Sequence, residues 1–126
     1  MASPKIAKVL VAELIHDSGL ELLKSSLGLE TDYRPELTED ELLKIVSNYD
    51  GLIVGSRTVV AKSVLERAPR LKALGKAGAG LDNIDVPGAT ARGVAVLAPV
   101  GLNSVSAAEH TIALMMAASR HIPFAD

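Results

Sequence analysis

The residues best suited to chemistry in this 126-residue chain are the glycines at positions 78 and 80. They open a segment with the sequence GAGLDNID, residues 78–85, which we call the glycine loop. Because glycine has no Cβ, the backbone N–H groups of such a loop can approach an anion closely. The pattern predicts an anion site built from the amides of Gly78, Ala79 and Gly80. The same residues can also serve as simple turn formers.

A second polar turn, GSRT at residues 55–58, follows an apolar run at 51–54. It carries the hydroxyl of Ser56 and the guanidinium of Arg57. Both this turn and the glycine loop come directly after predicted buried strands. In α/β folds, ligands bind beyond the carboxyl ends of parallel strands. The two turns are therefore candidates for one small-molecule site.

Strand-like and helix-like segments alternate along the first part of the chain. The expected strands are 6–12, 29–33, 51–54, 71–77 and 94–97, and the expected helices lie between them. Asp17 or Ser18 is expected to cap the first helix, and Thr38 with Glu41 forms a capping box for the second. This order predicts an α/β fold with a five-stranded parallel sheet and helices on both faces. The flavodoxin-like strand order 2-1-3-4-5 is expected.

A long helix is expected at residues 103–121, beginning at Asn103 or at the box 106–109. It is rich in alanine, and its smooth surface is suited to close packing. The five-stranded unit is complete without it. We therefore expect this helix to reach another domain or to form a homodimer contact.

The composition argues against several classes of function. The chain has no cysteine, and its three histidines lack the spacing of a metal-binding motif, so no metal is expected. A net charge of −2 and an aromatic content of 2% give no reason to expect nucleic acid as a partner. The N-terminal apolar run is too short for a signal peptide or a membrane span, which predicts a cytoplasmic protein with no membrane partner.

Two motifs together resemble the D-2-hydroxyacid dehydrogenases. One is KAGAGLDNID at residues 76–85, and the other is NSVSAAE at residues 103–109. The resemblance covers essentially the whole chain and is strongest to members that oxidise a phosphoglycerate in serine biosynthesis. It implies that residues 1–100 are a substrate-binding domain. Residues 101–126 would be the hinge and first helix of an NAD-binding domain.

The resemblance also implies roles for individual residues. The amides of Gly78, Ala79 and Gly80 would hold the carboxylate of a small 2-hydroxyacid or phosphoglycerate. Asn103, at the hinge, would reach the substrate or its neighbourhood. Ser56 would lie near the distal end of the substrate.

Three departures from the family pattern concern specificity. Gly55 stands where the family usually has an arginine that grips the substrate phosphate. Residues two apart in extended backbone point the same way, so Arg57 is a candidate substitute. Lys76 replaces a usual arginine and keeps the charge without the bidentate fork. At residues 98–100, APV replaces the usual NTP, which suggests either a relative that acts on a related 2-hydroxyacid or a divergent branch of the family.

The family's nucleotide fingerprint and its catalytic arginine, glutamate and histidine have no counterpart here. The glycine loop begins like G-x-G-x-x-G, but Asn83 replaces the third glycine. His110 lies on the last helix and is expected to be a surface or interface residue. We therefore expect NAD in a full-length enzyme, no cofactor for this chain, and no dehydrogenase activity from it alone. The alternative is a free-standing flavodoxin-like binding module, or a fragment that oligomerises through residues 103–121.

Overall fold

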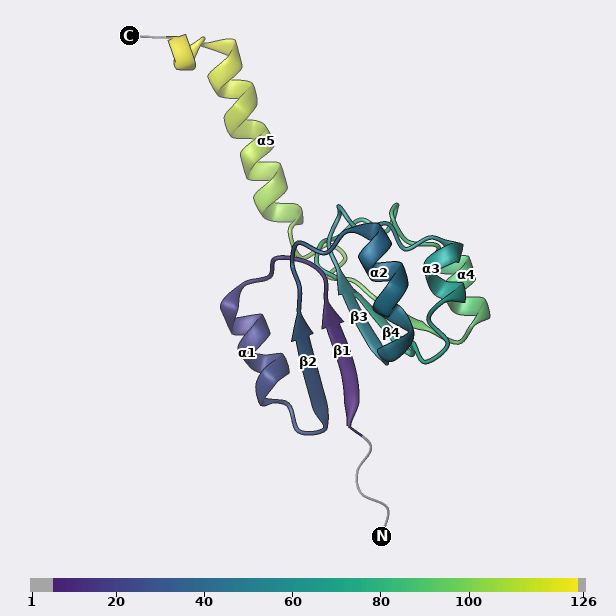
Figure 1. Ribbon diagram of the computed structural model, residues 1–126. Helices are drawn as coiled ribbons and strands as arrows, with labels where there is room; N and C mark the ends of the chain where they lie inside the picture. The colour runs from purple at the N-terminus through teal and green to yellow at the C-terminus, as the bar shows by residue number, and fades with distance from the viewer. Residues whose placement is uncertain (1–5, 125–126) are drawn as a thin grey trace.

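A computed structural model describes residues 6–124 and shows a five-stranded parallel sheet (Figure 1). The strand order is β2-β1-β3-β4-β5, which confirms the predicted fold and order. The strands are β1 (Ala7–Val11), β2 (Leu29–Tyr33), β3 (Gly51–Val54), β4 (Ala73–Lys76) and β5 (Ala95–Leu97). Successive strands are added on one side of β1 and then on the other, so the strand order reverses between β1 and β3. The carboxyl ends of these two strands therefore flank the switch point where ligands bind in such folds.

Helices join the strands in the predicted alternation. They are α1 (Asp17–Ser25), α2 (Glu39–Ile45), α3 (Lys62–Glu66), α4 (Val86–Ala91) and α5 (Ser104–Ser119), with short 3-10 turns at Val46–Asn48 and Ile122–Phe124. Parallel crossovers are right-handed. Because β2 and β4 lie on opposite sides of the β1–β3 pair, α1 covers one face of the sheet and α2, α3 and α4 cover the other.

The main hydrophobic core lies between the sheet and the helices α2, α3 and α4. Leu10, Leu52 and Leu74 pair in register across β1, β3 and β4, and each is at most 1% exposed. Leu42 of α2 and Leu65 of α3 pack in the same core. Burial of each such side chain contributes about 2 kcal/mol. The core therefore anchors the three central strands, and their carboxyl ends carry the candidate site.

The opposite face is covered less completely. Ile53, Gly75 and Leu97 pair in register across β3, β4 and β5, and Leu97 is 58% exposed. With Ala77 and Pro99 they line a shallow apolar depression. On this face, α1 is the helix that covers the sheet, and the part over β3, β4 and β5 is exposed.

Helix α5 projects away from the sheet (Figure 1). None of its residues is buried, and Ile112, Met115 and Met116 are all more than half exposed. The long helix that the sequence predicts is thus present, and it packs on no strand of the described sheet. Among the described residues, no helix is both long and apolar enough to cross a bilayer.

The prediction that Asp17 or Ser18 caps the first helix is wrong. His16 is the N-cap, and its Nδ1 accepts a hydrogen bond from the Ser18 amide at 3.3 Å. The backbone of His16 is extended, with φ −63° and ψ 144°, so helical geometry already begins at Asp17. An imidazole nitrogen here accepts the hydrogen bond from the first turn of the helix that the oxygen of a Ser, Thr, Asp or Asn side chain usually accepts.

The capping box of α2 is confirmed and yields a stability prediction. Thr38 Oγ1 accepts a hydrogen bond from the Glu41 amide at 3.3 Å, and Glu41 Oε2 accepts from the Thr38 amide at 3.0 Å. We expect Thr38→Ala to lower the free energy of unfolding by about 1 kcal/mol in urea denaturation, because an orphan helix amide loses its acceptor. Thr38→Ser keeps the oxygen and should retain most of the stability. Equal stability of the alanine and serine variants would contradict this role.

Candidate functional site

Lys76, the last residue of β4, joins the two turns that the sequence singles out. Its side chain is buried, with the residue 5% exposed. Its ammonium group donates to Gly55 O at 3.0 Å, to Ser56 Oγ at 3.2 Å and to Asn83 Oδ1 at 2.7 Å. An ammonium has three donors, and all three are used. Lys76 therefore positions the turn at 55–58 against the glycine loop, and no donor remains for direct contact with a ligand.

Asn83 is a second residue that holds these loops together. Its side-chain amide donates to Gly55 O at 2.8 Å and to Thr58 O at 2.6 Å, while its oxygen accepts from Lys76. Its backbone carbonyl also accepts from the Val60 amide at 2.8 Å. In the sequence, Asn83 draws attention only as the residue that replaces a third glycine. Its structural role becomes visible only when the ends of β3 and β4 are placed side by side.

The glycine loop offers backbone donors at this edge of the sheet. Gly78 has φ +143°, a conformation that residues with a side chain rarely adopt. Within residues 6–124, the amides of Gly78, Ala79 and Gly80 donate to no protein acceptor. The hydroxyl of Ser56 lies 3.9 Å from the place that a Cβ on Gly78 would take. Three uncommitted amides and a hydroxyl thus share one rim, as an anion site requires.

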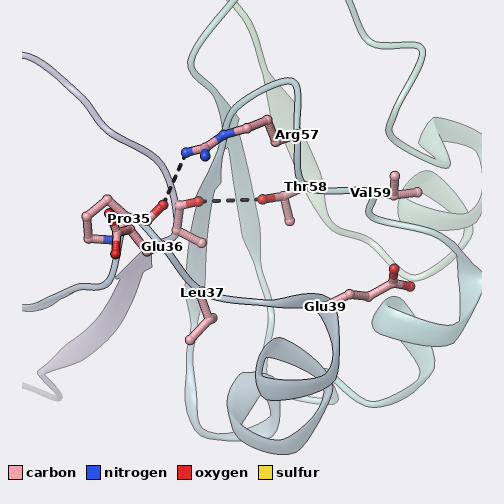
Figure 2. A pocket seen from close by; sticks show the side chains of 8 residues that line it. Pro35, Glu36, Leu37, Glu39, Arg57, Thr58 and Val59 are labelled. Carbon is pink, nitrogen blue, oxygen red and sulfur yellow. Dashed lines mark hydrogen bonds between the residues drawn. The ribbon is translucent and has the colours of Figure 1, made fainter.

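Arg57 extends to a different part of the rim (Figure 2). Its Nη2 lies 3.2 Å from Glu13 Oε1 and 3.3 Å from Pro35 O. Together with Thr58 and Ala12 it lines a pocket beside the β1–β3 switch point. Thr58 Oγ1 lies 3.5 Å from Ala12 O across this pocket. The structure therefore brings Ser56 to Gly78 and directs Arg57 towards β1 and the loop after β2.

Glu13 lies directly over Gly55. A Cβ built on Gly55 would overlap the carboxylate of Glu13, so the acidic side chain fills the space that a side chain at position 55 would need. The family resemblance marks Gly55 as the place of a missing arginine, and the sequence leaves Glu13 without a role. The neighbouring positions of β1 and β3 in the sheet bring the two residues together.

Asn103 is the predicted site residue that the structure does not bring to this rim. It is the residue before α5, is exposed, and its side chain makes no hydrogen bond within the described part of the chain. Its backbone carbonyl accepts from the Ala107 amide at 2.9 Å. No hydrogen bond joins it to the glycine loop in residues 6–124, so its role remains a prediction.

A separate polar cluster lies away from the glycine loop. Tyr49 donates its hydroxyl to Asp32 at 2.5 Å, and Arg34 Nε donates to the same carboxylate. The hydrogen bond from Arg34, followed by that from Tyr49, lowers the pKa of Asp32. Burial, followed by the bond to Asp32, raises the pKa of Tyr49 to about 12. The described residues contain no group of three or more histidine, cysteine or acidic side chains placed to hold a metal.

The model of the family described as "D-isomer specific 2-hydroxyacid dehydrogenase, catalytic domain" matches residues 9–122. The chain belongs to this family. The D-3-phosphoglycerate dehydrogenase of Archaeoglobus fulgidus is 44% identical to this chain over 94% of the chain's length. The enzyme of the same name from Mycobacterium tuberculosis is 45% identical over 94%. The chain spans only 22% of the length of each of these relatives.

Solved structures agree with this membership. The PH0520 protein of Pyrococcus horikoshii superposes with a TM-score of 0.78 at 35% identity, covering 94% of this chain and 35% of the other. The NAD⁺-bound 3-phosphoglycerate dehydrogenase of Entamoeba histolytica has a TM-score of 0.74 at 22% identity, covering 88% of this chain and 38% of the other. The second likeness bears on the fold alone. The fold of this chain thus corresponds to about one third of each of these longer chains.

Proposed function

We propose that this chain is the substrate-binding lobe of an NAD-dependent D-2-hydroxyacid dehydrogenase. The proposed substrate is 3-phosphoglycerate, oxidised to 3-phosphohydroxypyruvate in serine biosynthesis. Family membership and the names of the relatives support the reaction type and the substrate class. The observation that carries the proposal is the set of uncommitted amides at Gly78, Ala79 and Gly80.

These amides suit the carboxylate end of the substrate. Hydrogen bonds from backbone N–H groups to a carboxylate are charge-assisted, and each contributes about 1.5–3 kcal/mol. The ties from Lys76 and Asn83 hold the loop, so little ordering is needed when the ligand arrives. Ser56, beside Gly78, would meet the substrate further from the carboxylate, and Arg57 would meet the phosphate.

The glycine loop does not fit a dinucleotide. Its third-glycine position is filled by Asn83, whose side chain is committed to Gly55, Thr58 and Lys76. The helix that follows, α4, has only six residues, whereas a dinucleotide fold places the pyrophosphate at the start of a full crossover helix. We propose that NAD is held by another part of the enzyme and that this lobe is not catalytic alone.

Residues 101–126 are proposed to be the hinge and the first helix of the NAD-binding domain. The exposed apolar side chains of α5 support this proposal, because a helix with no buried residue needs a partner to cover it. A homodimer through α5 is the alternative arrangement. The mass of the chain in solution distinguishes the two, because only the alternative gives a dimer that Met115→Asp disrupts.

Titration of the chain with 3-phosphoglycerate, followed by backbone amide NMR, tests the proposed function. We expect the amide signals of Gly78, Ala79 and Gly80 to shift most, with D-glycerate shifting the same signals. NADH, added at the same concentrations, should shift none of them in a saturable way. Saturable binding of NADH, or shifts by the acids that bypass the glycine loop, would contradict the proposal.

A further inference from the structure

Glu13 occupies a position at the site that no role described so far explains. It follows β1 with its side chain only 15% exposed. Its Oε1 accepts from the Leu14 amide at 3.0 Å and lies 3.2 Å from Arg57 Nη2. The rest of its carboxylate fills the space above Gly55. A mostly buried carboxylate with these contacts is held in one place by its surroundings.

The position of Glu13 beside Arg57 determines the charge of the site where the phosphate end of the substrate is proposed to bind. Arg57 contributes one positive charge and Glu13 one negative charge, so the pair is neutral as a unit. The ammonium of Lys76 is nearby but is surrounded by the oxygens of Gly55, Ser56 and Asn83. A phosphate monoester carries about −1.5 to −2 charges at pH 7. To reach Arg57 it must replace Glu13 as the partner of the guanidinium or bind beside a like charge.

We propose that Glu13 is a specificity-determining residue that competes with the phosphate end of the substrate for Arg57. It acts through Arg57 and lowers the affinity of the lobe for a phosphorylated hydroxyacid, while the affinity for the carboxylate end is untouched. The inference rests on the proposed function of the glycine loop. It also makes Glu13 and Gly55 a coupled pair, because a side chain at position 55 requires the carboxylate of Glu13 to move.

The variant Glu13→Gln tests the proposal with little change in shape. Glutamine keeps an oxygen that can accept from the Leu14 amide and removes the charge that pairs with Arg57. We expect the Kd of 3-phosphoglycerate, measured by the shifts of Gly78 and Gly80, to fall about tenfold. The Kd of D-glycerate, which has the same carboxylate and no phosphate, should change less than twofold.

Two further variants separate this role from general effects. Glu36→Gln removes a charge from the same pocket at an exposed residue that has no hydrogen bond or ion pair with Arg57. It should change neither Kd by more than about twofold. In the double variant Glu13→Gln/Arg57→Ala, the gain in 3-phosphoglycerate affinity should disappear, because Glu13 acts only through the guanidinium.

The outcomes distinguish the inference from the proposed function. If both acids bind at the glycine loop and Glu13→Gln binds 3-phosphoglycerate no tighter than wild type, the role of Glu13 is wrong and the proposed function stands. If neither acid shifts the glycine loop in any folded variant, the proposed function falls and the inference with it. A gain equal in Glu13→Gln and Glu36→Gln also overturns the inference, because it shows only the effect of net charge.

A measurement without ligand tests the coupling to Gly55. Gly55→Ala should lower the Tm of the wild-type chain, because the new Cβ overlaps the Glu13 carboxylate. In the Glu13→Ala background the same substitution should leave the Tm unchanged. An equal loss of Tm in both backgrounds would overturn the coupled-pair part of the proposal.

Discussion

Replacement of Lys76 by methionine is expected to lower the free energy of unfolding by about 3 kcal/mol and to loosen the candidate site. Methionine reproduces the lysine side chain as far as Cε, lacks the ammonium group and donates no hydrogen bond. Ser56 Oγ and Asn83 Oδ1 would then lose the donor that Lys76 provides. An acceptor left without a partner in a buried place costs about 1–3 kcal/mol. Urea unfolding followed by circular dichroism measures the loss.

Lys72→Met is the matched control for this change. Lys72 lies just before the same strand, but it is exposed. The substitution removes the same charge, and its effect on stability should stay within about 0.5 kcal/mol. The amide signals of Ser56 and Gly78 should move in Lys76→Met and stay in place in Lys72→Met. If the two variants are equally stable and leave the same signals unchanged, the ties made by Lys76 do not hold the loops.

The fold could be predicted because each level of the sequence points to the same structure. Buried strands such as residues 51–54 are short apolar runs, and capping signals such as Thr38 mark where helices begin. The strand ends were less predictable. The sequence predicts a strand over residues 71–77, and the structure confines it to Ala73–Lys76. The neighbouring β3 has only four residues, so its ladder with β4 pairs only those four.

The candidate site was predictable only where one segment carries the signal. The glycine loop could be found from the sequence because its glycines are contiguous with the strand that presents them. The roles of Lys76, Asn83 and Glu13 depend on contacts between the ends of different strands. Lys76 and Gly55 are 21 positions apart, and Arg57 and Glu13 are 44 apart. The strand order makes these pairs neighbours, so contacts of this kind are visible only after the sheet is assembled.

Arg57 shows why the type of a residue does not settle its role. The spacing rule predicts only that the guanidinium of Arg57 lies on the same side as position 55. It cannot reveal that an acidic side chain already occupies the space over Gly55 and pairs with the guanidinium. The net charge offered to a ligand therefore differs from the charge that the residue types suggest. An unpaired arginine would attract any anion, whereas an arginine that is paired with a carboxylate favours the anions that can compete with that carboxylate.

Replacement of Gly78 by alanine is expected to weaken binding of D-glycerate and 3-phosphoglycerate by about 30-fold. The φ of +143° at Gly78 is strained for any residue with a Cβ, so the loop must move to accept alanine. The new Cβ would make only ordinary van der Waals contacts, at 3.4 Å from Lys76 Cε and 3.9 Å from Ser56 Oγ. We therefore expect the substitution to weaken binding by changing the direction in which the amides of the glycine loop point, and not by filling the site. Loss of one charge-assisted hydrogen bond, about 2 kcal/mol, corresponds to a loss of this size.

Gly93→Ala is the control that separates backbone strain from loss of the site. Gly93 also has a positive φ, +71°, and a Cβ there would meet nothing within 4 Å. It lies in the turn after α4, away from the rim, so its variant should lose about 1 kcal/mol of stability and bind both acids as wild type does. Gly78→Ala should lose comparable stability and also lose the binding. A ligand held by the amides of the glycine loop must bind more weakly when strain at position 78 turns those amides away. If Gly78→Ala binds D-glycerate as tightly as Gly93→Ala does, the amides of the glycine loop are therefore not the carboxylate site.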